Sequence, residues 1–218
     1  MARPRADDYH EKQKLILDTS ATLFAQKGFA GTSIAAIADY LNTSKALIYH
    51  YYQSKESLLF DMLHEHCRLL LETAIASQSQ STDPRGQMKL LLGSFMNIYV
   101  SSRAKHVVLL NDLHCLPNEQ QQQIRDIEKQ VVKIFRDLIE AIRPDLQEKV
   151  RTAVAMALLG ALNWTYIWFD PDGGLSAEAF AELTASLFFE GIQKIPAAAE
   201  NLDDTSIKLM LSAKETIS

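Results

Sequence analysis

The stretch from Thr32 to Lys55, TSIAAIADYLNTSKALIYHYYQSK, decides the fold. Four of its apolar side chains recur at i, i+3, i+4 and i+7, the spacing of one face of a short helix: Ile34, Ile37, Ala38 and Leu41. Thr32 or Ser33 can cap this helix, because a hydroxyl there accepts a hydrogen bond from an unpaired N–H of the first turn. The stretch therefore begins with a capped amphipathic helix.

A second helix follows after a tight turn. Asn42 sits where the chain must reverse, and asparagine tolerates the left-handed conformation better than most residues. Thr43 or Ser44 then caps a helix that runs from Lys45 to about Tyr51. The pattern is typical of a helix–turn–helix, which can place its second helix in the major groove of DNA.

The spacing along the second helix separates inward from outward side chains. Ile48 and Tyr52 fall at i and i+4, so we expect them to pack on the preceding helices. Lys45 lies on another face, where it can reach a guanine edge or a phosphate. The residues that we expect to contact DNA are Thr32, Ser33, Ser44, Lys45, Ala46, Leu47, Tyr49, His50 and Lys55. Simple surface packing is the alternative role for the tyrosine and the histidine in this set.

The charge distribution weakens the nucleic-acid interpretation without excluding it. The net charge is −5. Residues 1–56 hold 7 Lys and Arg against 6 Asp and Glu, whereas the remainder holds 15 against 21. The acidic excess thus lies outside the helix–turn–helix, and dimerisation would double any local positive charge.

The sequence indicates a cytoplasmic protein. No run of about 18 uncharged apolar residues occurs, so no membrane span is expected. The first twelve residues, MARPRADDYHEK, lack the apolar stretch of a signal peptide. Cys67 and Cys115 do not have the spacing of a metal site, so we expect free thiols and no bound metal.

Apolar periodicity and breaker residues predict an all-α fold. Beyond the helix–turn–helix, helices are expected over 9–27, 55–77, 87–102, 104–116, 118–142, 145–169 and 176–195. We divide the chain into a three-helix DNA-binding domain, a larger helical effector-binding and dimerisation domain, and a tail, over residues 1–54, 55–195 and 196–218. The polar residues 1–8 are expected to form an arm.

The pattern T-S-x-x-x-I-A-x-x-x-N-x-S-K-x-x-x-Y-H-Y-Y-x-S-K-E-x-L resembles the N-terminal domain of TetR/AcrR-family transcriptional regulators. The resemblance covers about residues 16–59. It departs from the family at Asn42 and Ala46, where glycine is usual, and at Tyr52 and Gln53. The resemblance implies a homodimeric repressor that binds a palindromic operator in double-stranded DNA.

The larger domain shows no catalytic motif. GxSxG, P-loop and HExxH patterns are absent from residues 57–218, so we expect no catalytic residue, no cofactor and no metal site. Large apolar side chains with polar groups among them indicate a ligand pocket instead. The expected pocket residues are Phe95, Tyr99, Arg103, His106, Leu110, His114, Asn163, Trp164 and Trp168. An ordinary hydrophobic core is the competing interpretation of the aromatic residues.

Residues 158–192 resemble the C-terminal helices of FadR-type regulators in the same family, through N-W-T-Y-x-W and the following P-x-G-G-L-S turn. That resemblance implies release by an acyl-CoA thioester of a fatty, aromatic or steroid-derived acid, and control of a catabolic operon. The nearly charge-free helix over 145–169 needs more cover than one small domain provides, which fits a dimer. The alternatives are a sensor of drugs or other hydrophobic molecules, and a helical lipid-binding protein that does not bind DNA.

Overall fold

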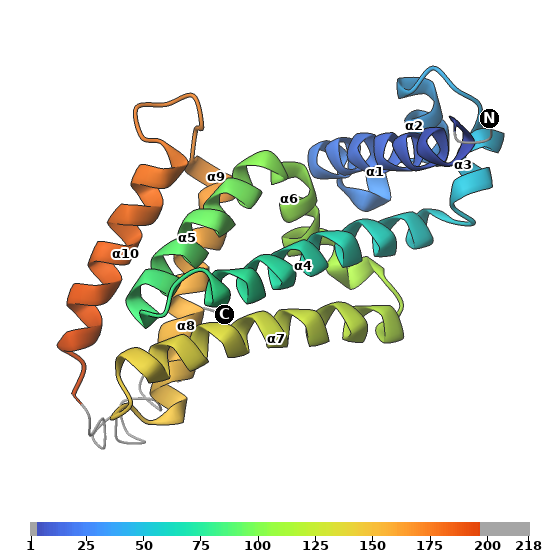
Figure 1. The fold of residues 1–218 in the computed structure, drawn as a ribbon. Helices are drawn as coiled ribbons and strands as arrows, with labels where there is room; N and C mark the ends of the chain where they lie inside the picture. The colour runs from blue at the N-terminus through green and yellow to red at the C-terminus, as the bar shows by residue number, and fades with distance from the viewer. Residues whose placement is uncertain (1–3, 197–218) are drawn as a thin grey trace, which may run out of the picture.

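The computed structural model describes residues 4–196, with side chains from residue 9 onward, and these residues contain helices and no strand. Figure 1 shows two parts joined by a long helix, α4: a small three-helix unit at one end and a larger helical body at the other. This arrangement confirms the predicted all-α fold. The tail expected from residue 196 lies outside the described residues except for Pro196.

The small unit consists of α1 (Pro4–Gly31), α2 (Ile34–Tyr40) and α3 (Lys45–Tyr51). Ser33 caps α2 and Ser44 caps α3, each hydroxyl accepting from a backbone N–H three residues later. Asn42 has a φ of 51°, as expected for the reversal between the helices. The arm expected over residues 1–8 is wrong for residues 4–8, which form the first turns of α1.

The small unit has a hydrophobic core made of the side chains that the apolar periodicity predicted to face inward. Ile37, Ile48 and Tyr52 are buried, together with Phe24 from α1. Gly28 has a φ of 74° and interrupts α1, so the chain can fold Phe29 back onto Phe24, with 5.3 Å between the ring centroids. The inward side of α3 is thereby fixed, and its other side chains are left outside.

Helix α4 (Lys55–Ser79) belongs to both parts of the molecule. Ser54 and Ser57 form a reciprocal cap at its start. Its first half packs into the core of the small unit through Leu58, and its second half packs into the core of the body through Leu70. A displacement of α4 therefore changes the packing of both cores.

The body contains α5 (Pro84–Ser101), α6 (Arg103–Asp112), a 3₁₀ turn (Leu113–Cys115), α7 (Asn118–Ile142), α8 (Glu148–Asn163), α9 (Thr165–Trp168) and α10 (Ala177–Gln193). The expected bounds of α7 are confirmed, and the expected helix over 104–116 tightens into the 3₁₀ turn.

The single helix expected over 145–169 is wrong. Helix α8 ends at Asn163, and the short α9 begins only at Thr165. The Thr165 hydroxyl donates to the carbonyl of Leu162 at 2.6 Å, a local bond of the kind by which threonine competes with regular helix hydrogen bonding. The break sends the chain in a new direction toward α10.

Candidate functional site

The outward face of α3 is the candidate DNA-binding surface. Lys45, Ala46, Tyr49 and His50 are exposed, and Leu47 is half-buried. Ser33 and Ser44 are also exposed, at the N-termini of α2 and α3, where partial positive charge from the helix dipole favours a phosphate. The structure thus brings seven of the nine expected side chains to one end of the small unit.

Thr32 and Lys55, two of the expected DNA contacts, have hydrogen-bond partners within the small unit. The Thr32 side chain is 1% exposed, and its hydroxyl lies within hydrogen-bond distance of the carbonyls of Leu23 and Gly28. Lys55 Nζ donates to the carbonyls of Phe29 and Thr32, at 2.7 and 2.9 Å. Both side chains therefore help to close the turn after α1.

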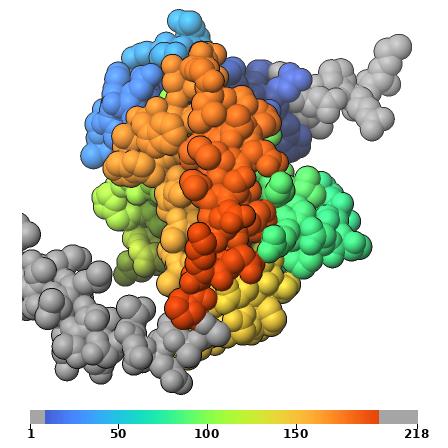
Figure 2. All heavy atoms as spheres, turned by 90° about the vertical axis from the view of Figure 1, so that its left-hand side faces the viewer, coloured from blue at the N-terminus to red at the C-terminus, as the bar shows by residue number. Residues whose placement is uncertain are grey.

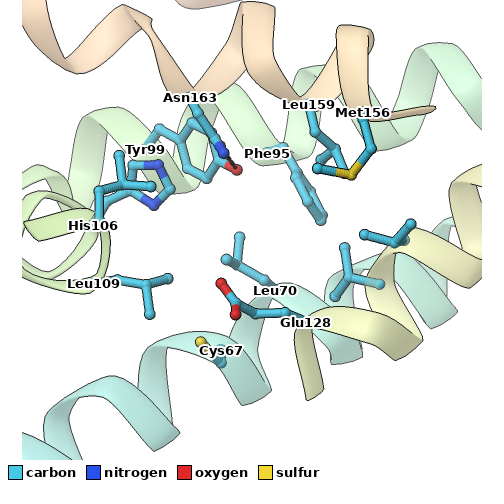
Figure 3. A pocket seen from close by; sticks show the side chains of 13 residues that line it. Cys67, Leu70, Phe95, Tyr99, His106, Leu109, Glu128, Met156, Leu159 and Asn163 are labelled. Atoms are coloured by element: carbon cyan, nitrogen blue, oxygen red, sulfur yellow. Dashed lines mark hydrogen bonds between the residues drawn. The ribbon is translucent and has the colours of Figure 1, made fainter. Parts of the chain in front are cut away.

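A cavity of about 200 Å³ lies in the body between α4, α5, α6, α7 and α8 (Figure 3). Five of the expected pocket residues line it: Phe95, Tyr99, His106, Leu110 and Asn163. Its other walls are mostly apolar and include Leu70 and Leu159. An apolar cavity with a few polar groups has the composition of a small-molecule site.

The polar groups gather on the side of the cavity formed by α5, α6 and the end of α8. The His106 ring is stacked on Tyr99, with centroids 3.7 Å apart, and its Nδ1 lies 3.2 Å from Nε2 of His66 on α4. The Tyr99 hydroxyl donates to Oδ1 of Asn163 at 2.8 Å. One connected set of hydrogen bonds and ring contacts therefore joins α4, α5, α6 and α8.

Burial keeps the two histidines neutral. It lowers the pKa of His66 to about 3 and that of His106 to about 4. Glu128, from α7, also lines the cavity, and burial raises the pKa of its carboxyl. Figure 3 shows this carboxylate pointing into the cavity from the wall opposite Asn163.

Four expected pocket residues lie elsewhere. Arg103 donates to the carbonyl of Tyr166 at 2.8 Å, outside the cavity, and His114 is exposed beside Cys115. Trp164 is 61% exposed and Trp168 is 49% exposed. The break after Asn163 explains the tryptophans, because it turns both of them away from the face of α8 that lines the cavity.

The sequence analysis missed several cavity residues, among them Cys67, Glu128 and Met156. Glu128 lies next to Ile127 on a helix whose polar residues mostly face outward, so its sequence context suggested an exposed carboxylate. The signal that could have found it is the i, i+3 relation to Val131, a core residue of α7.

The face formed by α8 and α10 is turned toward the viewer in Figure 2, and apolar side chains line the groove between the two helices. A groove of about 470 Å³ runs between the two helices, with Val154 and Ala157 on one side. On the other side Leu183 and Leu187 are 50% and 67% exposed. Contiguous exposed apolar surface of this kind marks an interaction site.

The described residues contain no candidate metal site and no candidate membrane span. No three His, Cys, Asp or Glu side chains there are grouped to hold a metal ion. None of the helices over residues 4–196 is both long and apolar enough to cross a membrane.

Comparison with known proteins bears on both parts of the molecule. Residues 16–62 match the model of bacterial regulatory proteins of the tetR family, and residues 81–192 match the tetracyclin repressor-like C-terminal domain. A TetR-family transcriptional regulator from Bordetella parapertussis 12822 is 34% identical, with a TM-score of 0.80 over 85% of this chain and 98% of that one. This chain belongs to the TetR family.

Two further relatives have a named function or named ligands. The transcriptional repressor KstR2 of Rhodococcus jostii is 23% identical over 88% of this chain and 98% of its own length. AibR, solved in complex with isovaleryl coenzyme A and operator DNA, is 25% identical over 81% of this chain and 97% of that one, with a TM-score of 0.71. These relatives are regulators, and one of them binds both an acyl-CoA and DNA.

Proposed function

We propose that this TetR-family protein is a dimeric transcriptional repressor that is released from its operator when an acyl-CoA thioester binds in the body cavity. The observation that carries the proposal is the placement of an apolar cavity against α4, the helix that also enters the core of the DNA-binding unit. The binding of isovaleryl coenzyme A by AibR supports the choice of effector.

The size of the cavity indicates which part of an acyl-CoA it can enclose. At about 200 Å³ it is smaller than the roughly 300–1,000 Å³ of typical small-molecule sites. It suits an acyl group of modest size, whereas the nucleotide of coenzyme A must remain outside. The exposed Met156 and Leu110 line the cavity, so its mouth lies between α8 and α6.

Helix α6 provides the proposed connection to the DNA-binding unit. Lys105 Nζ pairs with Asp18 of α1 at 3.0 Å and with Glu65 of α4 at 3.2 Å. Its neighbour in sequence, His106, lines the cavity. A ligand that displaces this part of α6 disturbs the contacts with α1 and α4 together. Such a ligand weakens DNA binding by as much as it prefers the displaced state.

DNA binding is assigned to the exposed face of α3 with the N-termini of α2 and α3. Lys45 is placed to read a base edge or hold a phosphate, and Tyr49 and His50 to contact the backbone. The apolar face of α8 and α10 is assigned to the partner subunit, which sets the distance between two α3 helices on a palindromic site.

The test is a titration of acyl-CoA thioesters of increasing chain length against the complex with operator DNA from upstream of the gene, followed by fluorescence anisotropy. We expect thioesters of small acids to release the operator, and unacylated coenzyme A to release it poorly. Met156→Trp, at the mouth of the cavity, should bind DNA but resist release, whereas the matched Met156→Leu should respond normally. Tight acyl-CoA binding without any loss of operator affinity would contradict the proposal.

A sensor of hydrophobic cations is the second candidate, favoured by Glu128. A carboxylate facing aromatic side chains in an apolar cavity can pair with a ligand cation. Release of the operator by a lipophilic cation, with no response to any thioester, would establish this function in place of the first. Neither candidate requires catalysis, and we assign no enzymatic activity.

A further inference from the structure

The polar side of the cavity contains a buried hydrogen-bonding atom without a partner among the described residues. His106 is 2% exposed, and its Nδ1 contacts His66, which leaves Nε2 without a hydrogen bond. Asn163 uses Oδ1 to accept from Tyr99, and the same side chain lies close enough to His106 to raise the pKa of that ring. Buried polar atoms in native proteins usually have partners, so an orphan beside a cavity indicates a ligand atom.

The charges around the cavity restrict what that atom can be. No lysine or arginine is found among the described residues that line the cavity, and Glu128 is its one carboxylic acid. The nearest cation on α6, Lys105, is held by Asp18 and Glu65. A ligand carboxylate would therefore enter without a cation and face the Glu128 carboxylate.

From this geometry we infer that His106 and Asn163 form a subsite for one neutral oxygen of the effector, the thioester carbonyl, and that Glu128 excludes the corresponding free acid. The inference rests on the proposed function, because it specifies how the same cavity recognises its ligand. The Asn163 amide donates to the carbonyl oxygen. His106 donates from Nε2 when its Nδ1 accepts from His66.

The subsite would let the repressor distinguish an activated acid from the same acid before activation. A thioester carbonyl accepts two hydrogen bonds and carries no charge. The free acid is ionised at neutral pH, and it gains no ion pair in the cavity to offset its desolvation. The effector is thus the product of a CoA-ligating reaction or an intermediate downstream of it.

The first experiment compares an acyl-CoA with the S-alkyl-CoA thioether of the same chain length, which lacks only the carbonyl oxygen. We expect wild-type protein to bind the thioester about tenfold more tightly, since two neutral hydrogen bonds contribute modestly each. His106→Phe preserves an aromatic ring against Tyr99, and Asn163→Leu preserves side-chain volume. Each should reduce the preference severalfold, mainly by weakening thioester binding. Equal wild-type affinities, or an unchanged preference in both variants, would overturn the subsite.

The second experiment removes coenzyme A and compares the free acid with its S-ethyl thioester by isothermal titration calorimetry. Wild-type protein should bind the ethyl thioester and reject the acid, whereas Glu128→Gln should improve affinity for the acid by about tenfold or more. Wild-type binding of the acid as tightly as the ethyl thioester would refute the exclusion. The melting temperature of each variant reports whether it is folded.

These results separate the subsite from the proposed function. If acyl-CoA and alkyl-CoA release the operator equally well, the protein is still a CoA-responsive repressor and only the subsite is refuted. If neither releases it at any concentration, the proposed function itself fails.

Discussion

The DNA-binding unit and the ligand cavity are built in different ways. In the unit, α2 and α3 each begin at a serine that caps its own helix, and a left-handed Asn42 sets the turn between them. The cavity instead depends on five helices, and its wall residue His106 contacts His66, 40 positions away in the sequence. Local chemistry thus specifies the proposed DNA-binding surface, whereas long-range packing specifies the proposed effector site.

The largest effect on operator affinity is expected from a substitution in the proposed dimer interface. Leu187→Glu places a charge at the most exposed leucine of the α8–α10 face, so the proposed dimer would bury an unpaired carboxylate from each subunit. Burial of unpaired charges costs several kcal/mol, so operator affinity should fall roughly a hundredfold or more. Analytical ultracentrifugation should show a monomer. Ile75→Glu, exposed on α4, is the control; an unchanged dimer in Leu187→Glu would remove this face from the interface.

The buried pair of His66 and His106 predicts that the stability of the folded protein depends on pH. Both rings have a lower pKa in the folded protein than the ordinary 6.5, so the unfolded chain binds more protons below that pH. Their contribution to stability is present above pH 6.5 and falls as the pH drops toward 4. By pH 5 the loss is about 4 kcal/mol for two such rings.

The measurement is urea unfolding from pH 7.5 to pH 5. The double variant His66→Leu and His106→Leu should show a flatter dependence than wild type, and His114→Leu, at an exposed position, should follow wild type. Parallel curves for wild type and the double variant would mean that the pair is not neutral in the folded state.

Two lysines separate DNA contact from structural support within the small unit. Lys45→Ala should weaken specific operator binding about 10- to 100-fold and leave stability unchanged, because its side chain is exposed on α3. Lys55→Met should do the reverse: loss of two charged hydrogen bonds lowers the free energy of unfolding by about 2 kcal/mol.

Anisotropy with operator DNA and thermal unfolding of both variants decide between these roles. A drop of about 4–8 °C in the melting temperature is expected for Lys55→Met, with operator affinity retained well below that temperature. Full operator affinity in Lys45→Ala would remove α3 as the recognition helix.

The smallest effect is expected at the turn. Asn42→Gly should change the free energy of unfolding by less than about 1 kcal/mol. Glycine adopts a φ of 51° without strain, but it loses more backbone entropy on folding than asparagine does, and the two effects oppose each other. Asn42→Ala should destabilise by about 1 kcal/mol. Urea unfolding measures both, and an alanine variant more stable than the glycine variant would show that backbone strain does not govern this position.

The sequence predicted the short-range features because each rests on residues a few positions apart. The bounds of α7, the cap at Ser44 and the buried side of α3 follow from such neighbours. The sequence does not show contacts between distant positions. Lys55 donates to the carbonyl of Phe29, 26 positions away, and no pattern near Lys55 predicts this bond.

The cavity shows the same limit. Tyr99, His106 and Asn163 were expected in a pocket because they are polar groups within apolar helices, and they meet as expected. Trp164 carried the same kind of signal and lies on the surface, because a break one residue long rotates it outward. Glu128 carried only its i, i+3 relation to Val131 as a signal, since the side of α7 that faces the cavity is set by how α7 packs against α4.

The position of Lys105 beside His106 has a consequence for the free protein and the DNA-bound protein alike. If the contacts of Lys105 with Asp18 and Glu65 couple effector and operator, the coupling acts equally in both directions. The factor by which the effector lowers the affinity for the operator equals the factor by which a bound operator lowers the affinity for the effector. Repressor on DNA then responds at a higher effector concentration than repressor free in solution, and the number of operators in the cell helps to set the threshold of the response.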